Sequence, residues 1–248
     1  MVVYLVVRQS NRFDPASDAP YRLSRSKLED FMRCPRCFYL DRRHGVDTPR
    51  SPPFTLNLAV DRLLKREFDR YRALGLPHPL MRQLGFTRPP FDHPELEAWR
   101  SHNVGLQHLH ESTGFLVYGA IDDLWVDDDG LLRIIEYKST STSKTVDLTD
   151  DWKASYKRQV EVYQWLLRRR GFRVSAIAHF VYVNARKTPE VFASRLEFDT
   201  HPLTHRGDDG WIDAALVEAR ACLTRERPPE RGVDCSWCAY RQEARAHE

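Results

Sequence analysis

The fold predicted for this chain rests mainly on the residues from Tyr118 to Tyr163. This stretch reads YGAIDDLW at residues 118–125, VDDDGL at 126–131, RIIEYKST at 133–140 and, after a gap, YKRQVEVYQWLL at 156–167. The Asp/Gly cluster at 127–130 is typical of the turn that closes a hairpin. The run Leu131–Tyr137 is rich in Ile and Leu and short enough for a strand. The pattern predicts two adjacent strands followed by a helix.

Acidic residues interrupt both predicted strands, where apolar residues would be expected. Asp122 lies in the first strand, and Glu136 and Lys138 close the second. Side chains alternate along a strand, so Glu136 and Lys138 project from one face. Two carboxylates, a backbone carbonyl and water suit Mg²⁺ or Mn²⁺, and a lysine can orient water or neutralise charge on a phosphate. An isolated E-x-K is more often a surface salt bridge, but the apolar residues around these acids favour a metal site.

Three motifs in this stretch resemble those of the PD-(D/E)XK nuclease superfamily, and within it the RecB-type branch that includes the CRISPR-adaptation exonucleases. They are G-x-I-D at 119–122, E-x-K at 136–138 and Y-x-x-Q-x-x-x-Y at 156–163. The resemblance implies that Asp122 and Glu136 bind the metal and that Lys138 is the catalytic lysine. Tyr137 is predicted to supply the backbone carbonyl.

The resemblance also implies a helical motif, Gln159 and Tyr163, beside the site. These residues are four apart and share a helix face, although the spacing alone equally fits a core tyrosine with a neutral neighbour. Adjacent strand residues face opposite sides. We therefore expect Asp122 inside the site and Asp123 outside it, unless a β-bulge reverses them.

A long amphipathic helix is predicted over Thr55–Leu74. In the related nucleases this helix usually carries a histidine that faces the metal, and the matching position here is Asp61. Aspartate is also a suitable ligand for Mg²⁺ or Mn²⁺. The alternative is a solvated Asp61 paired with Lys65, four residues on. The apolar positions that define the predicted buried face are Leu56, Ala59, Val60, Leu63, Leu64 and Phe68.

Two Cys-x-x-Cys pairs, Cys34/Cys37 and Cys235/Cys238, lie near opposite ends of the chain. Four thiolates in such pairs match either a zinc site or an iron–sulfur cluster. In the related nucleases one N-terminal and three C-terminal cysteines hold a [4Fe–4S] cluster. Here the last of these positions is Ala244, and Cys37 is the candidate replacement ligand. Both Zn²⁺ and [4Fe–4S] stay open, and Cys222 is predicted to be a buried core residue.

The remaining elements are predicted from periodicity and capping residues. Ser24 is expected to cap a helix. Residues 75–94 read as a loop, and residues 94–110 as a helix whose three histidines (102, 108 and 110) match no metal-binding spacing. A further helix is expected over 151–170, followed by strands at 173–183 and 191–198 and a helix at 208–224.

Composition and charge limit the classes of protein to which the chain can belong. The chain has 248 residues with 42% hydrophobic content and a formal net charge of +3, which is too weakly basic to indicate nucleic acid by itself. No apolar run is long enough to span a membrane, and residues 1–7 are too short for a signal peptide. Five cysteines without an export signal indicate a reducing, cytoplasmic environment, in which paired cysteines more often hold metal than form disulfides.

Together these features predict an α/β protein with a restriction-endonuclease-like mixed sheet flanked by helices. We expect an arm over 1–20 and one domain over 21–248, comprising a helical cap (21–112), a catalytic core (113–200) and a C-terminal helix with a cysteine clip (201–248). The predicted function is that of a metal-dependent DNA nuclease. Its pathway and partners stay open among DNA repair, CRISPR adaptation, phage defence and mobile-element processing. The alternatives are an inactive nucleic-acid-binding relative and a zinc-clipped interaction protein.

Overall fold

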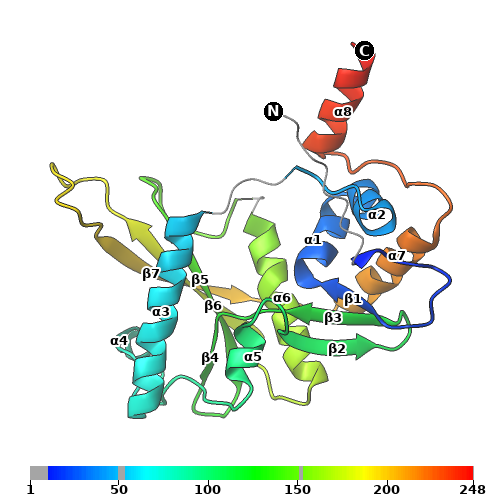
Figure 1. Cartoon of the computed structure of the whole chain (residues 1–248). Helices are drawn as coiled ribbons and strands as arrows, with labels where there is room; N and C mark the ends of the chain where they lie inside the picture. The colour runs from blue at the N-terminus through cyan, green and yellow to red at the C-terminus, as the bar shows by residue number, and fades with distance from the viewer. Residues whose placement is uncertain (1–10, 50–53, 151–152, 248) are drawn as a thin grey trace. The chain divides into compact units, whose positions relative to one another are not determined.

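The computed structural model describes residues 11–49, 54–150 and 153–247. Residues 1–10 of the predicted arm and the predicted start of the helix at 151–152 lie outside these ranges. The chain forms two compact units, each made of separate segments (Figure 1). The terminal unit comprises residues 1–51, 107–118 and 210–248, and the central unit comprises residues 52–106 and 119–209. Both combine helices with a mixed sheet, which confirms the predicted α/β class.

The central unit is built on a four-stranded sheet in the order β4-β5-β6-β7. The predicted hairpin is confirmed: β4 (Asp123–Val126) pairs antiparallel with β5 (Leu132–Thr140), and Gly130 in the turn has φ 75°. The next pair, β5 and β6 (Ile177–Ala185), is parallel and is joined by the crossover helix α6 (Ala154–Arg169), as a parallel connection requires. The last strand, β7 (Phe198–Arg206), is antiparallel to β6.

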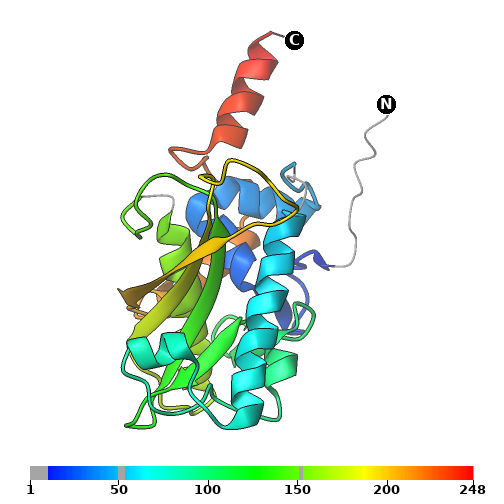
Figure 2. The same ribbon diagram turned by 90° about the vertical axis from the view of Figure 1, so that its left-hand side faces the viewer.

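Two helices of the central unit contact opposite faces of β5. The helix α3 (Thr55–Leu74) has the predicted bounds, and its Phe68 ring lies 5.6 Å from the ring of Tyr137. On α6, Gln159 donates a hydrogen bond to Glu136. Since Tyr137 and Glu136 are neighbours on one strand, their side chains point to opposite faces. Figure 2, which has α3 in the foreground, shows this helix running along the strands.

The apolar face predicted for α3 is only partly correct. Phe68 is buried in a core cluster with Trp125, Ile135 and Tyr137, and Leu64 packs against that cluster. Leu56 and Leu63 are instead exposed, at 57% and 60%. Among the residues predicted for this face, Phe68 and Leu64 therefore provide the packing of α3 against the core of its unit. Two short helices, α4 (Pro79–Gln83) and α5 (Leu96–Arg100), follow α3 in the same unit.

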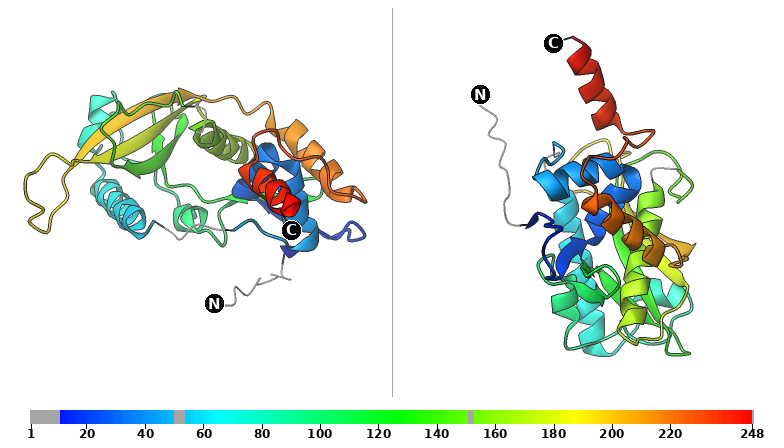
Figure 3. Two further views of the ribbon diagram at one scale, coloured as in Figure 1. Left: turned by 90° about the horizontal axis from the view of Figure 1, so that it is seen from above. Right: turned by 90° about the vertical axis from the view of Figure 1, so that its right-hand side faces the viewer.

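The terminal unit contains a three-stranded sheet in the order β1-β3-β2, with β1 parallel to β3. Four helices accompany this sheet, and Figure 3 shows α8 extending away from the other three. As predicted, Ser24 caps the first helix by accepting a hydrogen bond from the Lys27 N–H. The elements are β1 (Tyr21–Ser24), α1 (Arg25–Arg33), α2 (Pro35–His44), β2 (Leu106–His110), β3 (Phe115–Gly119), α7 (Ile212–Thr224) and α8 (Ser236–Ala246).

The first predicted strand is wrong as a single element. The run 118–125 divides between β3, which ends at Gly119, and β4, which begins at Asp123, and the two strands belong to different sheets. Between them the Ile121 N–H donates to the Trp99 carbonyl instead of to a neighbouring strand. Apolar composition identified both strands, but it contains no information about this change of hydrogen-bonding partner.

The helix predicted over 94–110 is also wrong, because α5 ends at Arg100 and the strand β2 begins at Leu106. Gly105, with φ 68°, separates them, and a Cβ there would lie 2.6 Å from the Gly119 carbonyl oxygen. Residues 75–94, predicted as a loop, contain α4. The predicted strand at 191–198 is displaced to 198–206, because Ala193 and Ser194 have positive φ values that a strand excludes.

Candidate metal centres

The predicted E-x-K and helical motifs meet in the central unit. The Lys138 ammonium donates to Glu136 Oε1 at 2.7 Å and to Gln159 Oε1 at 3.2 Å. Gln159 Nε2 donates to the same Glu136 oxygen at 2.8 Å and to Tyr163 Oη at 3.2 Å. Glu136 and Gln159 are buried. Strand β5 and helix α6 therefore hold these four side chains in one hydrogen-bonded group.

A fifth residue of the quoted motif, Tyr156, contacts this group. The Lys138 ammonium lies over its ring, 4.2 Å from the centroid, a geometry that attracts a cation to the π face. Tyr156 precedes Gln159 by three residues, so one turn of α6 presents both to Lys138. The sequence marked Tyr156 as part of the motif but assigned it no role.

Asp122 lies immediately before β4, outside the ladder. Its Oδ2 accepts a hydrogen bond from the backbone N–H of Tyr137 at 2.9 Å, and its Oδ1 lies 2.9 Å from the ammonium of Lys65 on α3. Asp122 therefore reaches β5 next to Glu136. The backbone of Asp122 is also held, because Arg100 Nε donates to its carbonyl oxygen at 2.9 Å. Sequence reasoning missed Arg100, since this contact depends on how α5 packs in the unit.

Asp61 is connected to Asp122 through Lys65. The ammonium of Lys65 lies 2.9 Å from an oxygen of each carboxylate. Burial opposes the charged form of Lys65, but the two carboxylates outweigh it and raise the Lys65 pKa. Burial and the negative charge of Asp122 raise the pKa of Asp61, while Lys65 and His102 act in the opposite direction. Lys65 thus forms the expected i,i+4 ion pair with Asp61 and a second ion pair with Asp122.

Asp123 points away from this group and is completely buried. It accepts a hydrogen bond from the Tyr137 hydroxyl at 2.9 Å and forms ion pairs with Arg72 and Arg100. Burial, together with the Asp123 charge, raises the pKa of Tyr137, so its hydroxyl stays a donor. Since Tyr137 and Glu136 face opposite sides of β5, Asp123 lies on the side away from Glu136.

The oxygen ligands predicted for a divalent cation are present in the central unit, but they are not closely grouped. Among the described residues, the four cysteines are the only group of three or more metal-ligating side chains whose ligand atoms lie within 4.8 Å of one another. Asp61 and Asp122 lie on either side of Lys65, and Glu136 is bound by Lys138. Carboxylates and a backbone carbonyl still form the donor set that Mg²⁺ and Mn²⁺ prefer.

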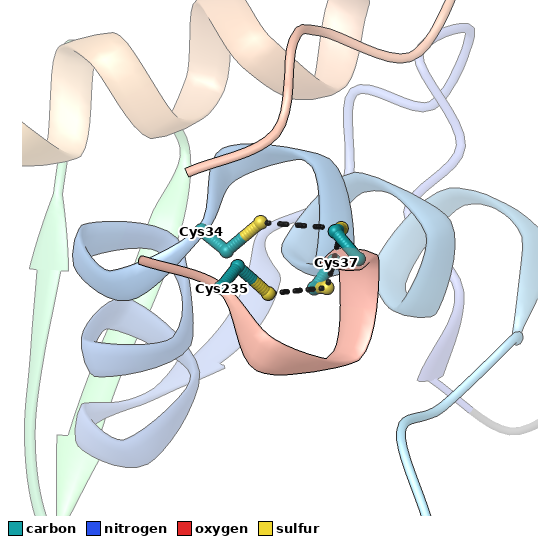
Figure 4. Close-up of side chains that lie close together, drawn as sticks. Cys34, Cys37 and Cys235 are labelled. Carbon is teal, nitrogen blue, oxygen red and sulfur yellow. Dashed lines mark hydrogen bonds between the residues drawn. The ribbon is translucent and has the colours of Figure 1, made fainter. Parts of the chain in front are cut away.

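The four cysteines of the two Cys-x-x-Cys pairs converge in the terminal unit. Figure 4 shows the sulfur atoms of Cys34, Cys37 and Cys235 close together. Cys37 Sγ lies 3.6 Å from both Cys235 Sγ and Cys238 Sγ, and Cys34 Sγ lies 3.9 Å from Cys238 Sγ. Cys34 ends α1 and Cys37 lies in the first turn of α2, while Cys235 immediately precedes α8 and Cys238 lies in its first turn.

These distances fit a single tetrahedral ion. Four Zn–S bonds of about 2.3 Å at tetrahedral angles place the sulfur atoms roughly 3.8 Å apart. In a four-iron cluster each thiolate binds a different iron, which moves the sulfurs further apart. Burial opposes ionisation of Cys34, but hydrogen bonds from the backbone N–H groups of Gly232 and Cys37 outweigh it and lower the Cys34 pKa to about 7. One thiolate is therefore favoured within the group.

The fifth cysteine and the other histidines lie elsewhere. The Cys222 thiol contacts the carbonyl oxygen of Pro35 at 3.6 Å, and burial raises its pKa to about 11. His108 and His110 belong to strand β2, and His110 lies 3.5 Å from Asp213. Within the described ranges, no helix is both long and apolar enough to cross a membrane.

Comparison with known proteins identifies one family. The model of the PD-(D/E)XK nuclease superfamily matches residues 55–242. None of the curated proteins matches the chain. Among solved structures, the one described as "Crystal structure of SSO0001" is 16% identical and has a TM-score of 0.35; the match covers 84% of this chain and 79% of that one. A likeness of this degree supports no conclusion about the site.

Proposed function

Because the chain belongs to the PD-(D/E)XK nuclease superfamily, we propose that it is a metal-dependent DNA nuclease of the RecB-type branch that includes the CRISPR-adaptation exonucleases. Asp122, Glu136 and Lys138 form its active site. The superfamily implies a nucleic-acid substrate and a divalent cation. DNA as the substrate and the branch are our inferences from the motifs, and a cytoplasmic location is our inference from the paired cysteines.

One observation carries the proposal: Lys138, Glu136 and Gln159 are joined by hydrogen bonds on adjacent elements, next to Asp122. A structural salt bridge would need only Lys138 and Glu136. The addition of a buried amide that contacts both, and of a second carboxylate on the neighbouring chain segment, is an arrangement for which packing alone provides no reason. Buried charged groups that have specific charged and hydrogen-bonding partners concentrate at functional sites.

Asp122, Glu136 and the Tyr137 carbonyl would hold Mg²⁺ or Mn²⁺, and Asp61 would add a further carboxylate. The bound cation supplies Lewis-acid chemistry, polarising a phosphate and making bound water more acidic. Lys138 places a positive charge where negative charge develops on the phosphate. Gln159 orients both Glu136 and Lys138 through its amide, and Tyr163 fixes the orientation of that amide.

The cysteine group has a structural role in this proposal. We infer that it holds Zn²⁺ because the sulfur spacing of 3.6–3.9 Å supports one tetrahedral ion better than a [4Fe–4S] cluster. The ion would join the segment around residues 34–37 to the segment around 235–238, closing a loop that includes most of the chain. Such a closure stabilises the folded state by restricting the unfolded one.

The test is cleavage of DNA by the purified full chain. End-labelled linear DNA and closed circular DNA are incubated with Mg²⁺, with Mn²⁺ and with EDTA, alongside the Glu136→Ala variant. Metal-dependent cleavage that the variant lacks supports the nuclease; loss of linear DNA alone indicates an exonuclease. Binding without cleavage under every metal condition would instead identify an inactive nucleic-acid-binding relative. Neither binding nor cleavage would point to a zinc-clipped interaction protein.

A further inference from the structure

The helix α8 in the terminal unit buries none of its side chains. An 11-residue helix of this kind is marginally stable in water on its own. Its attachment is at its first turn, where Cys235 and Cys238 join the cysteine group. Two large aromatic side chains on it, Trp237 and Tyr240, are 41% and 72% exposed. A helix held at one end with exposed aromatic residues is suited to contact something outside its unit.

A basic pocket lies beside the base of α8. The pocket, of about 310 Å³, is lined by four arginines, Arg36, Arg231, Arg241 and Arg245, together with Glu230, Cys238 and Gln242. Arg241 and Arg245 follow Cys238 by three and seven residues, so these three side chains share one helix face. Arg36 is held from α2, where it donates to the Pro229 carbonyl at 3.3 Å.

The chemistry of this pocket matches a phosphate-bearing chain. The lining contains four guanidinium groups and one carboxylate, so its net charge is positive. The planar guanidinium group of arginine can bind two phosphate oxygens at once. Trp237 and Tyr240 lie on the helix stripe next to the pocket arginines. A basic groove flanked by exposed aromatic rings is the arrangement that binds single-stranded nucleic acid, because unstacked bases can pack on the rings.

We propose that the pocket and the aromatic stripe of α8 form a binding site for a single strand of DNA, separate from the residues that cleave it. The choice of DNA as the ligand of this site rests on the proposed function. Because α8 is attached through the cysteine group, the metal at that group sets the position of the site. A role in binding thus adds to the stabilising role of the cysteines.

The experiment measures binding of a fluorescent single-stranded oligonucleotide, and of the matching duplex, to the full metal-loaded chain by anisotropy over a series of salt concentrations. All proteins carry Glu136→Ala so that cleavage does not interfere. The test variants are Arg241→Gln/Arg245→Gln, Arg231→Gln and Tyr240→Ala. The control is Arg227→Gln, which removes an exposed arginine of the same unit that does not line the pocket.

We expect the double arginine variant to bind the single strand at least about tenfold more weakly, with the slope of log K against log salt reduced by roughly 0.7 for each lost phosphate contact. Arg231→Gln should reduce the slope by roughly 0.7, the value expected for the loss of one phosphate contact. Tyr240→Ala should weaken single-strand binding roughly 5- to 150-fold with an unchanged slope and little effect on the duplex. The control should match the parent protein.

Several results would overturn the site. One is unchanged affinity and slope in the double variant. Another is loss of bound metal from the same variant in step with the loss of binding, which would mean that the arginines only neutralise the charge of the metal–thiolate group. Displacement of the oligonucleotide by equimolar inorganic phosphate or by polyglutamate would indicate a free-anion or a protein ligand. If wild-type protein fails to cleave but these binding effects appear, the nuclease proposal fails and the site stands. If wild-type protein cleaves DNA but these binding effects are absent, the binding site fails and the nuclease proposal stands.

Discussion

In the terminal unit four thiols converge until their sulfur atoms lie within 4.8 Å, whereas in the central unit lysines stand among the carboxylates. The difference follows from charge. Neutral thiols can approach one another at little electrostatic cost, but ionised carboxylates repel and require cations nearby. Lys65 and Lys138 provide that positive charge. A divalent ion in the central unit must therefore compete with ammonium groups, while a metal in the terminal unit meets a preorganised ligand set.

The two centres should therefore differ in how firmly they hold metal. We expect the cysteine group to retain its ion through purification and the acidic group to exchange its ion freely. Cys235→Ser and Glu136→Gln test the two centres, and Asp123→Asn and His179→Phe test the packing of the central unit around its site. The four substitutions are ordered below by the size of the expected effect.

Cys235→Ser should have the largest effect. Zinc binding to a structural site is worth roughly 10–16 kcal/mol in small zinc domains, so we expect loss of bound metal and destabilisation of the terminal unit by more than about 4 kcal/mol. Metal analysis and thermal unfolding measure the two effects, and limited proteolysis should release α8. Cys222→Ala is the control, because that buried thiol lies outside the group and should leave the metal content unchanged. Equal metal content in Cys235→Ser and the control would refute a four-cysteine site.

Glu136→Gln should abolish the activity of the central unit without unfolding it. The variant keeps the shape of the side chain but removes a ligand charge, and we expect DNA cleavage to fall at least roughly 10²- to 10³-fold. Cleavage rates with saturating Mn²⁺ and circular dichroism check the two parts. Asp199→Asn, which removes an exposed carboxylate of the same unit that pairs with Arg186, should cleave normally. Full activity in Glu136→Gln would remove Glu136 from the site.

Asp123→Asn should destabilise the central unit by about 3–5 kcal/mol, because it leaves Arg72 and Arg100 without their fully buried counter-charge. Chemical denaturation of the variant gives the loss in free energy of unfolding. Asp69→Asn is the matched control. It contacts the same two arginines, but its side chain is 41% exposed, so its loss should be under about 1 kcal/mol. Similar losses for both would show that burial of Asp123 does not set its contribution.

His179→Phe should have the smallest effect at neutral pH, where it loses the 3.3 Å contact between His179 Nδ1 and the Thr204 hydroxyl, and it should mainly change the pH dependence of stability. Burial and the charge of Arg133 lower the His179 pKa from 6.5 to about 4. The unfolded chain therefore binds the proton first, and stability is lost as pH falls below 6.5 and through 4. This amounts to on the order of 2–3 kcal/mol.

Phenylalanine keeps the ring contacts of residue 179 with Trp125 and Phe86 and removes the titration. The free energy of unfolding should then fall less steeply between pH 7 and 4 than in the parent chain. His247→Gln changes an exposed histidine, 76% accessible, and should leave the slope as it is. An identical slope in His179→Phe would show that His179 is protonated equally in both states.

Local pattern was enough to predict part of both centres. The Asp/Gly turn, the alternation around Glu136 and the spacing of Gln159 and Tyr163 depend on neighbours within one element, and the hairpin and the helix α6 follow them. The two Cys-x-x-Cys pairs likewise indicated a shared group, since each pair needs only one turn of chain to orient its thiols.

The α/β class, the extent of α3 and the identity of the chemical groups could therefore be predicted from local sequence. Three features required the three-dimensional arrangement of the chain: Lys65 bridges Asp61 to Asp122, Arg100 holds the Asp122 backbone, and α8 buries none of its side chains. The division of residues 118–125 between two sheets required it as well. All four depend on which contacts are made, or not made, with residues far away along the chain, and such contacts leave no periodic signal in the local sequence.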